Sequence, residues 1–319
     1  MALSAVMLLA MTACSSITPN AGTTNTGIGG TDASTAPATP LATASIVLKV
    51  SHPDNDTSML ENTWNCYART FKNSLEIYSN GEMTCEIFPN DQLGDLTSCM
   101  EQCSQGVVDV CLSPATGNLA SWIPNINVFD IPYIVENMDA CNLVCEGDIY
   151  RELSDNLDEV AHMRLLSMFQ TGFRNIDTWT APVRSVDDLA GMKLRIQEID
   201  AHTAMASAWK AVPTTVSFSE LYSAATTGVI DGFENCNYTL FMKNLYETVN
   251  YITETQHLAN VVCTLISSTV YDGLTPEQQE AVDRAAADAR RATIGVVAAN
   301  YSSTMQQTMF VMFFFIMVF

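Results

Sequence analysis

The chain has 319 residues, of which 14 are lysine or arginine and 35 are aspartate or glutamate, giving a formal net charge of −21. Such a field repels nucleic acid and anionic lipid headgroups at long range, so we expect no nucleic-acid partner. It does not exclude a small anionic ligand, because the few groups inside a pocket decide binding. The length allows two modest lobes.

The N-terminal sequence, MALSAVMLLAMTACSS, is an apolar run that ends in small residues and Cys14. It is similar to a bacterial lipoprotein signal with a lipid-modified cysteine, and a short buried helix is the alternative. The Ser/Thr/Gly/Ala/Pro tract that follows, residues 15–45, predicts a flexible tether. A lipid on Cys14 would anchor the mature protein to the cell membrane without spanning it.

Strand and helix patterns alternate through the first half of the chain, which predicts an α/β fold with largely parallel sheets. The predicted strands are residues 46–50, 83–88, 107–112 and 163–169. The predicted helices are residues 57–78, 95–105, 138–144 and 150–157.

The stretch 191–235 contains two further predicted strands with a short helix between them. Arg195 ends the apolar strand 193–196, and the polar pair Glu234–Asn235 follows the strand 229–233. In open α/β sheets ligands bind outside the carboxyl ends of the strands, so we expect Arg195 and Asn235 on one rim. A guanidinium there suits a carboxylate or phosphate.

An internal similarity relates CMEQCSQGVVDV (residues 99–110) to ELYSAATTGVIDG (residues 220–232). Both segments are a helix, a glycine and then a strand that begins Val-Val/Ile-Asp. The similarity predicts two lobes built on the same plan, and chance is the alternative because such connections are common.

The last predicted element is a helix from Pro276 to about Thr308, which Thr275 and Gln278 begin as a capping box. At 1.5 Å per residue it is roughly 50 Å long, enough to lie across both lobes. Residues 309–319 are eleven apolar residues, short of the roughly 20 that span a bilayer. A truncated transmembrane segment, a terminal core element and an aberrant end of the gene are alternatives, and we expect the last.

Besides Cys14 there are nine cysteines, an odd number that cannot all pair within one chain. The four histidines show no zinc-type spacing to them, so we expect no metal and interpret the thiols as small buried hydrophobic side chains. A reduced habitat would tolerate them.

Eight segments, in this order, resemble the extracytoplasmic solute-binding subunit of tripartite ATP-independent periplasmic (TRAP) transporters of the dicarboxylate-binding DctP type. They are FPNDQLGD (88–95), QGVVD (105–109), IPNINVFDIPYI (123–134), GFRN (172–175), PVRSVDDLAGMKLRIQ (182–197), VPTTVSFSELYSAATTGVIDGFEN (212–235), TQHL (255–258) and LTPEQQEAVDRAAADA (274–289).

The resemblance implies a two-lobed periplasmic-binding-protein fold, type II-like, with crossing strands and a long helix spanning both lobes. We expect lobe I at residues 46–170 and 261–299, and lobe II at residues 171–260 and 300–319. It also implies that a small organic acid is held in the interlobe cleft and delivered to the small and large TRAP membrane subunits. We expect a monomer without a cofactor.

The resemblance also implies site residues. Arg195 matches an arginine that forms a salt bridge with the ligand carboxylate, and Arg174 a second arginine at the same ligand. Asn235 matches a polar contact and Phe218 an aromatic that packs over the ligand. His52, near a position that is asparagine in sialic-acid-binding members, is a further candidate contact.

Structural roles are the alternatives for these residues. Arg195 could be paired with Glu198 or Asp188, and Arg174 with Asp177. Asn235 could cap a turn, and Phe218 could belong to the core. Trp179, Tyr133 and Tyr238 could line the cleft, although we expect them in the core.

Two other functions compete with transport. An enzyme is disfavoured because the sequence has no nucleophile elbow, HExxH motif or phosphate-binding glycine loop. A ligand-binding sensor lipoprotein of the same fold is the alternative that the sequence leaves open.

Overall fold

The computed structural model describes residues 44–242 and 244–318, with the side chains of 241, 242 and 301–318 left out. Cys14 and residues 15–43 of the predicted tether therefore lie outside the described residues. All described elements belong to one compact unit.

Eight strands form a single mixed sheet in the order β2-β1-β3-β8-β4-β7-β5-β6. In chain order they are β1 (Ile46–Ser51), β2 (Met83–Phe88), β3 (Val110–Ala115), β4 (Met163–Thr178), β5 (Lys193–Ile196), β6 (Val212–Thr215), β7 (Gly232–Cys236) and β8 (Tyr251–Ser267). The order reads alike from both edges, with β1, β2 and β3 in the places that β5, β6 and β7 take in the other half. The fold is therefore two-lobed, as predicted.

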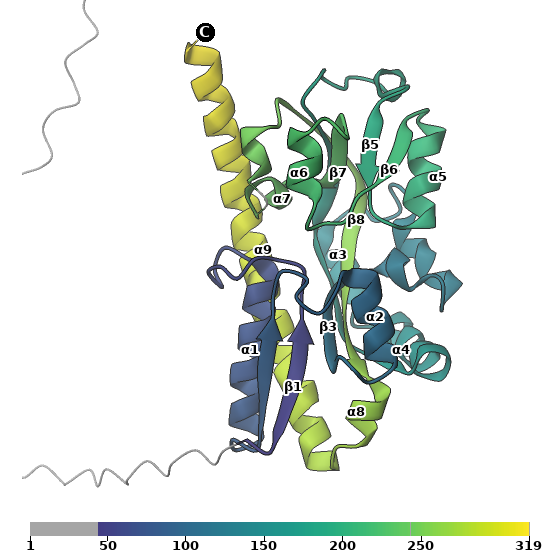
Figure 1. Ribbon diagram of the computed structural model, residues 1–319, viewed down its shortest axis with the longest axis vertical. Helices are drawn as coiled ribbons and strands as arrows, with labels where there is room; N and C mark the ends of the chain where they lie inside the picture. Colours follow the sequence, from purple (N-terminus) through teal and green to yellow (C-terminus); the bar gives the residue numbers. More distant parts are fainter. Residues whose placement is uncertain (1–43, 243, 319) are drawn as a thin grey trace, which may run out of the picture. The chain divides into compact units, whose positions relative to one another are not determined.

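Helices cover the sheet of both halves (Figure 1). They are α1 (Thr63–Tyr78), α2 (Leu96–Ser104), α3 (Met138–Val144), α4 (Asp148–Ala161), α5 (Asp200–Ala208), α6 (Leu221–Thr226), α7 (Tyr238–Met242), α8 (Ser268–Asp272) and α9 (Pro276–Val318). Short 3₁₀ turns lie at Thr116–Leu119, Pro124–Asp130, Val186–Leu189 and Leu245–Glu247.

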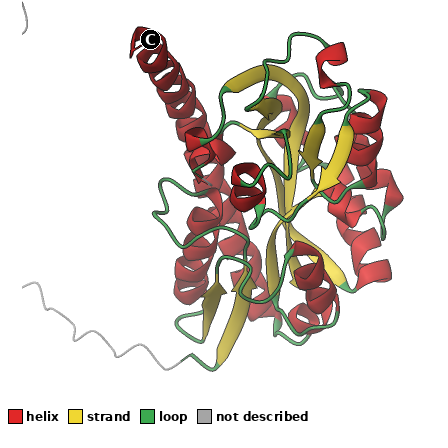
Figure 2. Ribbon diagram, turned by 45° about the horizontal axis from the view of Figure 1, so that its top comes forward, coloured by secondary structure: helices red, strands yellow, loops and turns green. Residues whose placement is uncertain are grey.

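The long strands β4 and β8 connect the halves (Figure 2). They run antiparallel from the Met163–Ser267 pair to the Thr178–Tyr251 pair, with register shifts along the way. The expectation of crossing strands is confirmed. The expectation of a largely parallel sheet is wrong at the centre, because β8 pairs antiparallel with both β3 and β4, and β4 pairs antiparallel with β7.

The internal similarity is a structural repeat. In the first half the Lys49 N–H of β1 donates to Asp109 Oδ2 at 2.6 Å, and the Lys49 ammonium donates to a carbonyl after α2. In the second half the Lys193 N–H of β5 donates to Asp231 Oδ2 at 2.9 Å, and its ammonium donates to a carbonyl after α6. In both halves, therefore, the same two lysine hydrogen bonds, one from the backbone N–H and one from the ammonium group, fix the start of β3 and of β7.

These lysine hydrogen bonds explain why both strands begin later than predicted. The predictions started at residues 107 and 229, immediately after a glycine, whereas β3 starts at Val110 and β7 at Gly232. Gly106 and Gly228 both have φ of +72°, so each chain still turns there before its aspartate ends the turn. As a result Glu234 and Asn235 lie inside β7 rather than after it.

The helices α1 and α9 pack together on one face of the first half. Ala281, Val282, Ala285 and Ala289 of α9 share a core with Tyr67 and Phe71 of α1. The helix α9 also contacts α7 of the second half, so the prediction of a long helix spanning both lobes is confirmed (Figure 1).

Two helix ends differ most from the prediction. The helix α1 starts at Thr63 rather than 57, because Asn62 caps it by accepting from the N–H groups of Trp64 and Asn65. The helix α9 continues to Val318, ten residues beyond its predicted end. Within the part of the chain that the structure describes, none of the helices combines the length and apolar character needed to cross a membrane.

The nine cysteines of the described chain are free thiols and are all buried. Burial raises the pKa of Cys85 and of Cys236 to about 12, so both are neutral. The interpretation of the thiols as small buried hydrophobic side chains agrees with this. Among the described residues, no three His, Cys, Asp or Glu side chains form a group that could hold a metal ion.

Candidate ligand-binding site

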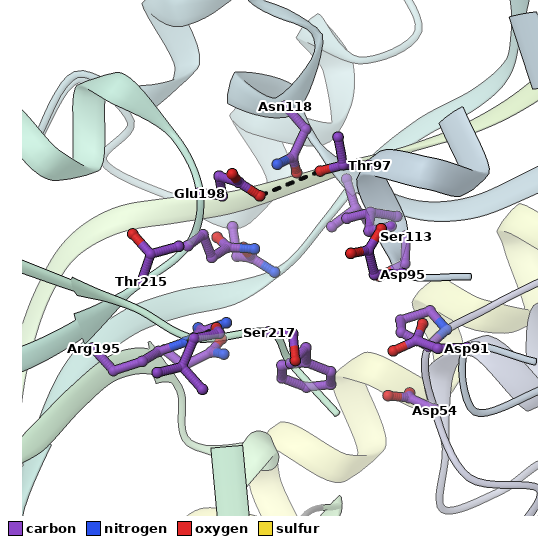
Figure 3. Close-up of a pocket in the computed structure, with 18 of the residues that line it drawn as sticks. Asp54, Asp91, Asp95, Thr97, Ser113, Asn118, Arg195, Glu198, Thr215 and Ser217 are labelled. Carbon is purple, nitrogen blue, oxygen red and sulfur yellow. Dashed lines mark hydrogen bonds between the residues drawn. The ribbon is translucent and has the colours of Figure 1, made fainter. Parts of the chain in front are cut away.

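A cavity of about 280 Å³ lies between the two halves, at the carboxyl ends of the parallel strands (Figure 3). Its lining residues from the first half include Asp54, Asp91, Asp95, Thr97, Ser113 and Asn118. Those from the second half include Arg174, Arg195, Glu198, Ser217, Phe218 and Asn235. Arg195 and Asn235, which the sequence predicted on one rim, both line this cavity.

The alternation of β5 determines the direction of Arg195. Leu194 and Ile196 pack into the core of the second half, so the residue between them turns to the other face. There Arg195 is only 3% exposed, and its Nε donates to the Val216 carbonyl at 2.9 Å. Its Nη1 has no hydrogen-bond partner among the described residues.

Burial lowers the pKa of Arg195 to about 10, an effect that Glu234 partly offsets. The guanidinium is therefore still charged at neutral pH, but it has given up hydration without a matching anion. Neither structural alternative holds. Asp188 accepts from the N–H groups of Arg184 and Ser185, and Glu198 accepts from the Thr97 hydroxyl.

Arg174 also lines the cavity, but its own network uses its hydrogen-bond donors. Its Nε and Nη2 hold the Glu234 carboxylate and carbonyl, and Nη1 donates to Asn235 Oδ1 at 3.3 Å and Asn260 Oδ1 at 2.8 Å. The alternative of pairing with Asp177 is wrong in its partner, because Glu234 takes that role.

Glu234 is the centre of a buried charge network that the sequence did not reveal. His202 of α5 lies 3.3 Å from Glu234 Oε1 and 3.0 Å from Asp130 Oδ1. His257 of β8 lies 3.5 Å from Glu234 Oε2. Burial alone would raise the pKa of Glu234, but Arg174 and His202 outweigh it and hold that pKa well below its ordinary value.

Two other candidates line the cavity, and one does not. Asn235 accepts from Arg174 and from the Cys236 N–H, while its amide nitrogen has no described hydrogen bond and can donate to a ligand. Phe218 lies at the cavity beside Val216 and packs against the core of α6 and β7. His52 is buried just after β1 and is not a lining residue, although its neighbour Pro53 is.

The three aromatic residues expected in the core have three different environments. Tyr238 lines the cavity. Trp179 packs against the core of the second half and donates to the Ile230 carbonyl. Tyr133 is 65% exposed, so the core expectation is wrong there.

Asp177 is a buried carboxyl without a hydrogen-bond partner in the described chain. Burial, then Glu234 and Glu254, raise its pKa well above the ordinary value. Such a group costs stability above its unfolded pKa of about 3.9, and the cost grows as pH rises towards its folded pKa. We expect Asp177→Asn to raise the free energy of unfolding by about 1–3 kcal/mol at pH 8 and by less at pH 5.

Urea denaturation at the two pH values measures this gain, and Asp155→Asn on the exposed face of α4 is the matched control. A variant that is less stable than the parent at pH 8 contradicts the expectation.

Comparison with known proteins agrees with this geometry. Residues 56–309 match the family described as bacterial extracellular solute-binding protein, family 7. The chain is similar to the C4-dicarboxylate-binding periplasmic protein DctP of Rhodobacter capsulatus, with 28% identity over 283 residues, 88% of this chain and 82% of that protein.

Among solved structures, the chain is similar to a TRAP periplasmic solute-binding protein of Roseobacter denitrificans with bound L-galactonate. The TM-score is 0.78 at 27% identity, over 83% of this chain and 86% of the other. The family model, the two-lobed fold and the cavity between the lobes agree, and the chain belongs to family 7 of the bacterial extracellular solute-binding proteins.

Proposed function

We propose that this protein is an extracytoplasmic receptor that captures a small organic acid in the cavity and delivers it to a TRAP-type membrane permease. One observation carries the proposal. Arg195 is a buried cation that lines the cavity, and its Nη1 has no hydrogen-bond partner in the described chain. A ligand carboxylate would supply the missing anion and accept charge-assisted hydrogen bonds there. The relatives that bind C4-dicarboxylates and L-galactonate support this class of ligand.

The other site residues have complementary roles in this proposal. Asn235 donates to the carboxylate, and Phe218 covers the apolar part of the ligand. Arg174 lends positive charge and holds Asn235 and Asn260 in place, because its donors already serve protein groups.

Lobe closure would accompany capture. Thr97 of α2 donates to Glu198, which follows β5, at 3.4 Å, so a hydrogen bond already crosses between the halves (Figure 3). A ligand that touches both halves binds the closed form better and shifts the population towards it. Lobe boundaries at residues 170/171, 260/261 and 299/300 remain part of this proposal.

A thermal-shift panel tests the proposal. We expect one class among C4-dicarboxylates, keto acids, aromatic acids and sugar acids to raise the melting temperature, increasingly with ligand concentration. Matched amides that lack the carboxylate are the control. If no acid in the panel stabilises the protein, or if the amides stabilise it equally, the carboxylate assignment fails.

We also propose that the receptor performs no chemistry, acts as a monomer and is tethered by a lipid on Cys14. A bound acid should be recovered unchanged after long incubation. The alternative, a sensor lipoprotein of the same fold, predicts that genes for one small and one large TRAP membrane subunit are absent beside this gene, whereas transport predicts their presence.

A further inference from the structure

The strand β5 and the residue after it present two side chains to the cavity, Arg195 and Gln197. Leu194 and Ile196 pack into the core of the second half, so residues 195 and 197 turn to the opposite face. Successive residues on one face of a strand are about 7 Å apart. A single small molecule can therefore contact both side chains.

Each of these side chains has a buried polar atom that lacks a partner. Arg195 Nη1 is a hydrogen-bond donor and Gln197 Oε1 is an acceptor, and neither atom is hydrogen-bonded within the described residues. A buried acceptor that stays unpaired costs stability, so such atoms are rare in folded proteins. A bound molecule that accepts at Arg195 and donates at Gln197 would satisfy both atoms at once.

The two arginines that line the cavity are not equally available to a ligand. Arg174 is held by Glu234, and its Nη1 donates to Asn235 and Asn260. Arg195 can therefore pair with one carboxylate of a ligand, whereas a second carboxylate would lack a comparable counter-ion. Beside Gln197 a second carboxylate would also meet an amide oxygen, and two acceptors cannot form a hydrogen bond.

Neutral hydrogen-bonding groups of both halves complete this part of the wall. Figure 3 shows Ser113 and Asn118 of the first half and Thr215 of the second half at the cavity. Asn118 Oδ1 accepts from the Ala115 N–H at 2.9 Å, which leaves its amide nitrogen to donate to a ligand. Such groups suit hydroxyls, which both donate and accept.

We propose that the ligand is a hydroxylated monocarboxylate and that Gln197 selects it. The carboxylate accepts from Arg195, and a hydroxyl group of the same molecule donates to Gln197 Oε1. This inference rests on the proposed carboxylate receptor and names its ligand class. An ammonium group can also donate to an amide oxygen, but at Gln197 it would be a second cation close to Arg195, and like charges repel.

Calorimetry on the full chain with five-carbon acids tests the inference. Pentanoate is compared with 2-, 3-, 4- and 5-hydroxypentanoate, and with glutarate as the dicarboxylate of equal length. We expect the hydroxypentanoate whose hydroxyl reaches Gln197 to bind about tenfold or more tightly than both pentanoate and glutarate, because a polar site rejects an analogue that leaves its buried group unpaired.

A variant of similar shape identifies the residue responsible. Methionine is as long as glutamine but lacks the amide, so Gln197→Met should reduce the preference for the hydroxy acid over pentanoate to about twofold or less, with pentanoate binding unchanged. The melting temperature without ligand should stay the same or rise, because an unpaired buried acceptor is removed. Gln105→Met, at the exposed residue after α2, is the matched control and should keep the preference.

A hydroxyl preference that survives in Gln197→Met contradicts the inference. Equal weakening of all the acids by this substitution also contradicts it, because the amide would then bind the carboxylate. If none of the acids binds, or if glutarate binds most tightly, the inference fails as well. The proposed receptor function is judged separately by the panel of organic acids, in which a stabilising dicarboxylate would uphold the function without this ligand class.

Discussion

Replacing Arg195 by alanine is expected to lower the affinity for the carboxylate ligand at least a hundredfold. Removing one partner of a buried charge pair costs about 2–5 kcal/mol, and a hundredfold corresponds to about 2.8 kcal/mol. The ligand carboxylate would still lose its hydration on entering the cavity, but no directed cation would replace it. Calorimetry of the best ligand from the panel measures the change.

The same substitution is expected to leave the ligand-free fold intact. The alanine variant loses one hydrogen bond, from Arg195 Nε to the Val216 carbonyl, which is worth about 1 kcal/mol. It also loses a buried charge whose Nη1 has no partner among the described residues. Burial depresses the pKa of Arg195, so the charged form weakens the folded state at neutral pH, and its removal offsets the lost bond. The melting temperature without ligand should therefore change little or rise.

Arg184→Ala is the matched control, because that arginine is exposed outside the cavity. Arg195→Lys should fall between the parent and alanine, because lysine keeps the charge but not the planar fork. Unchanged affinity in Arg195→Ala would remove this residue from the site. A large loss of stability without ligand would show that its role is structural.

The sequence predicted the local elements of this fold better than the long strands. Helix 138–144 and strand 83–88 have the predicted bounds, since each is a short segment with its own periodicity and end signals. The strand β4 was predicted to stop at residue 169 but continues to Thr178. Its second half carries the buried polar residues Thr171, Arg174 and Asp177, and Arg174 and Thr171 find their partners Glu234 and Asn260 far along the chain.

The strand β8 was missed altogether. Its first half, which begins at Tyr251, is partly exposed and polar, and only the run after Gln256 is continuously buried. The apolar segment 258–266, LANVVCTLI, was the available signal. Because β8 is stabilised by pairing with β4, almost ninety residues away, its existence depends on tertiary contacts more than on local propensity.

The candidate site was likewise predicted where the signal lies in a local motif and missed where distant segments meet. Arg195, Arg174, Asn235 and Phe218 were identified through family motifs and all line the cavity, although ligand contact stays a prediction for each. Glu234 stood beside Asn235 in the sequence, yet its partners Arg174, His202 and His257 come from β4, α5 and β8. Spacing along the chain cannot report such a meeting of distant segments.

Replacing Glu234 by glutamine is expected to cost about 3–5 kcal/mol of unfolding free energy at neutral pH. Arg174 is 1% exposed, and the glutamine would leave its charge buried without a counter-ion. The glutamine could still accept one hydrogen bond, so the loss measures chiefly the missing charge. Urea denaturation gives the value, and Glu101→Gln on exposed α2 is the control.

The loss should depend on pH in a defined window. Because Arg174 and His202 depress the folded pKa of Glu234, its contribution is present above its unfolded pKa of about 4.3 and declines as pH falls towards the folded value. Burial alone would lower the pKa of His202, but Glu234 and Asp130 outweigh it and raise that pKa. The stabilisation that protonated His202 contributes is therefore present below its unfolded pKa of about 6.5 and declines as pH rises through the folded pKa. The stability gap between parent and variant should therefore be widest at about pH 5–6. A gap below about 1 kcal/mol, or one that stays constant from pH 4 to 8, would show that another group neutralises Arg174.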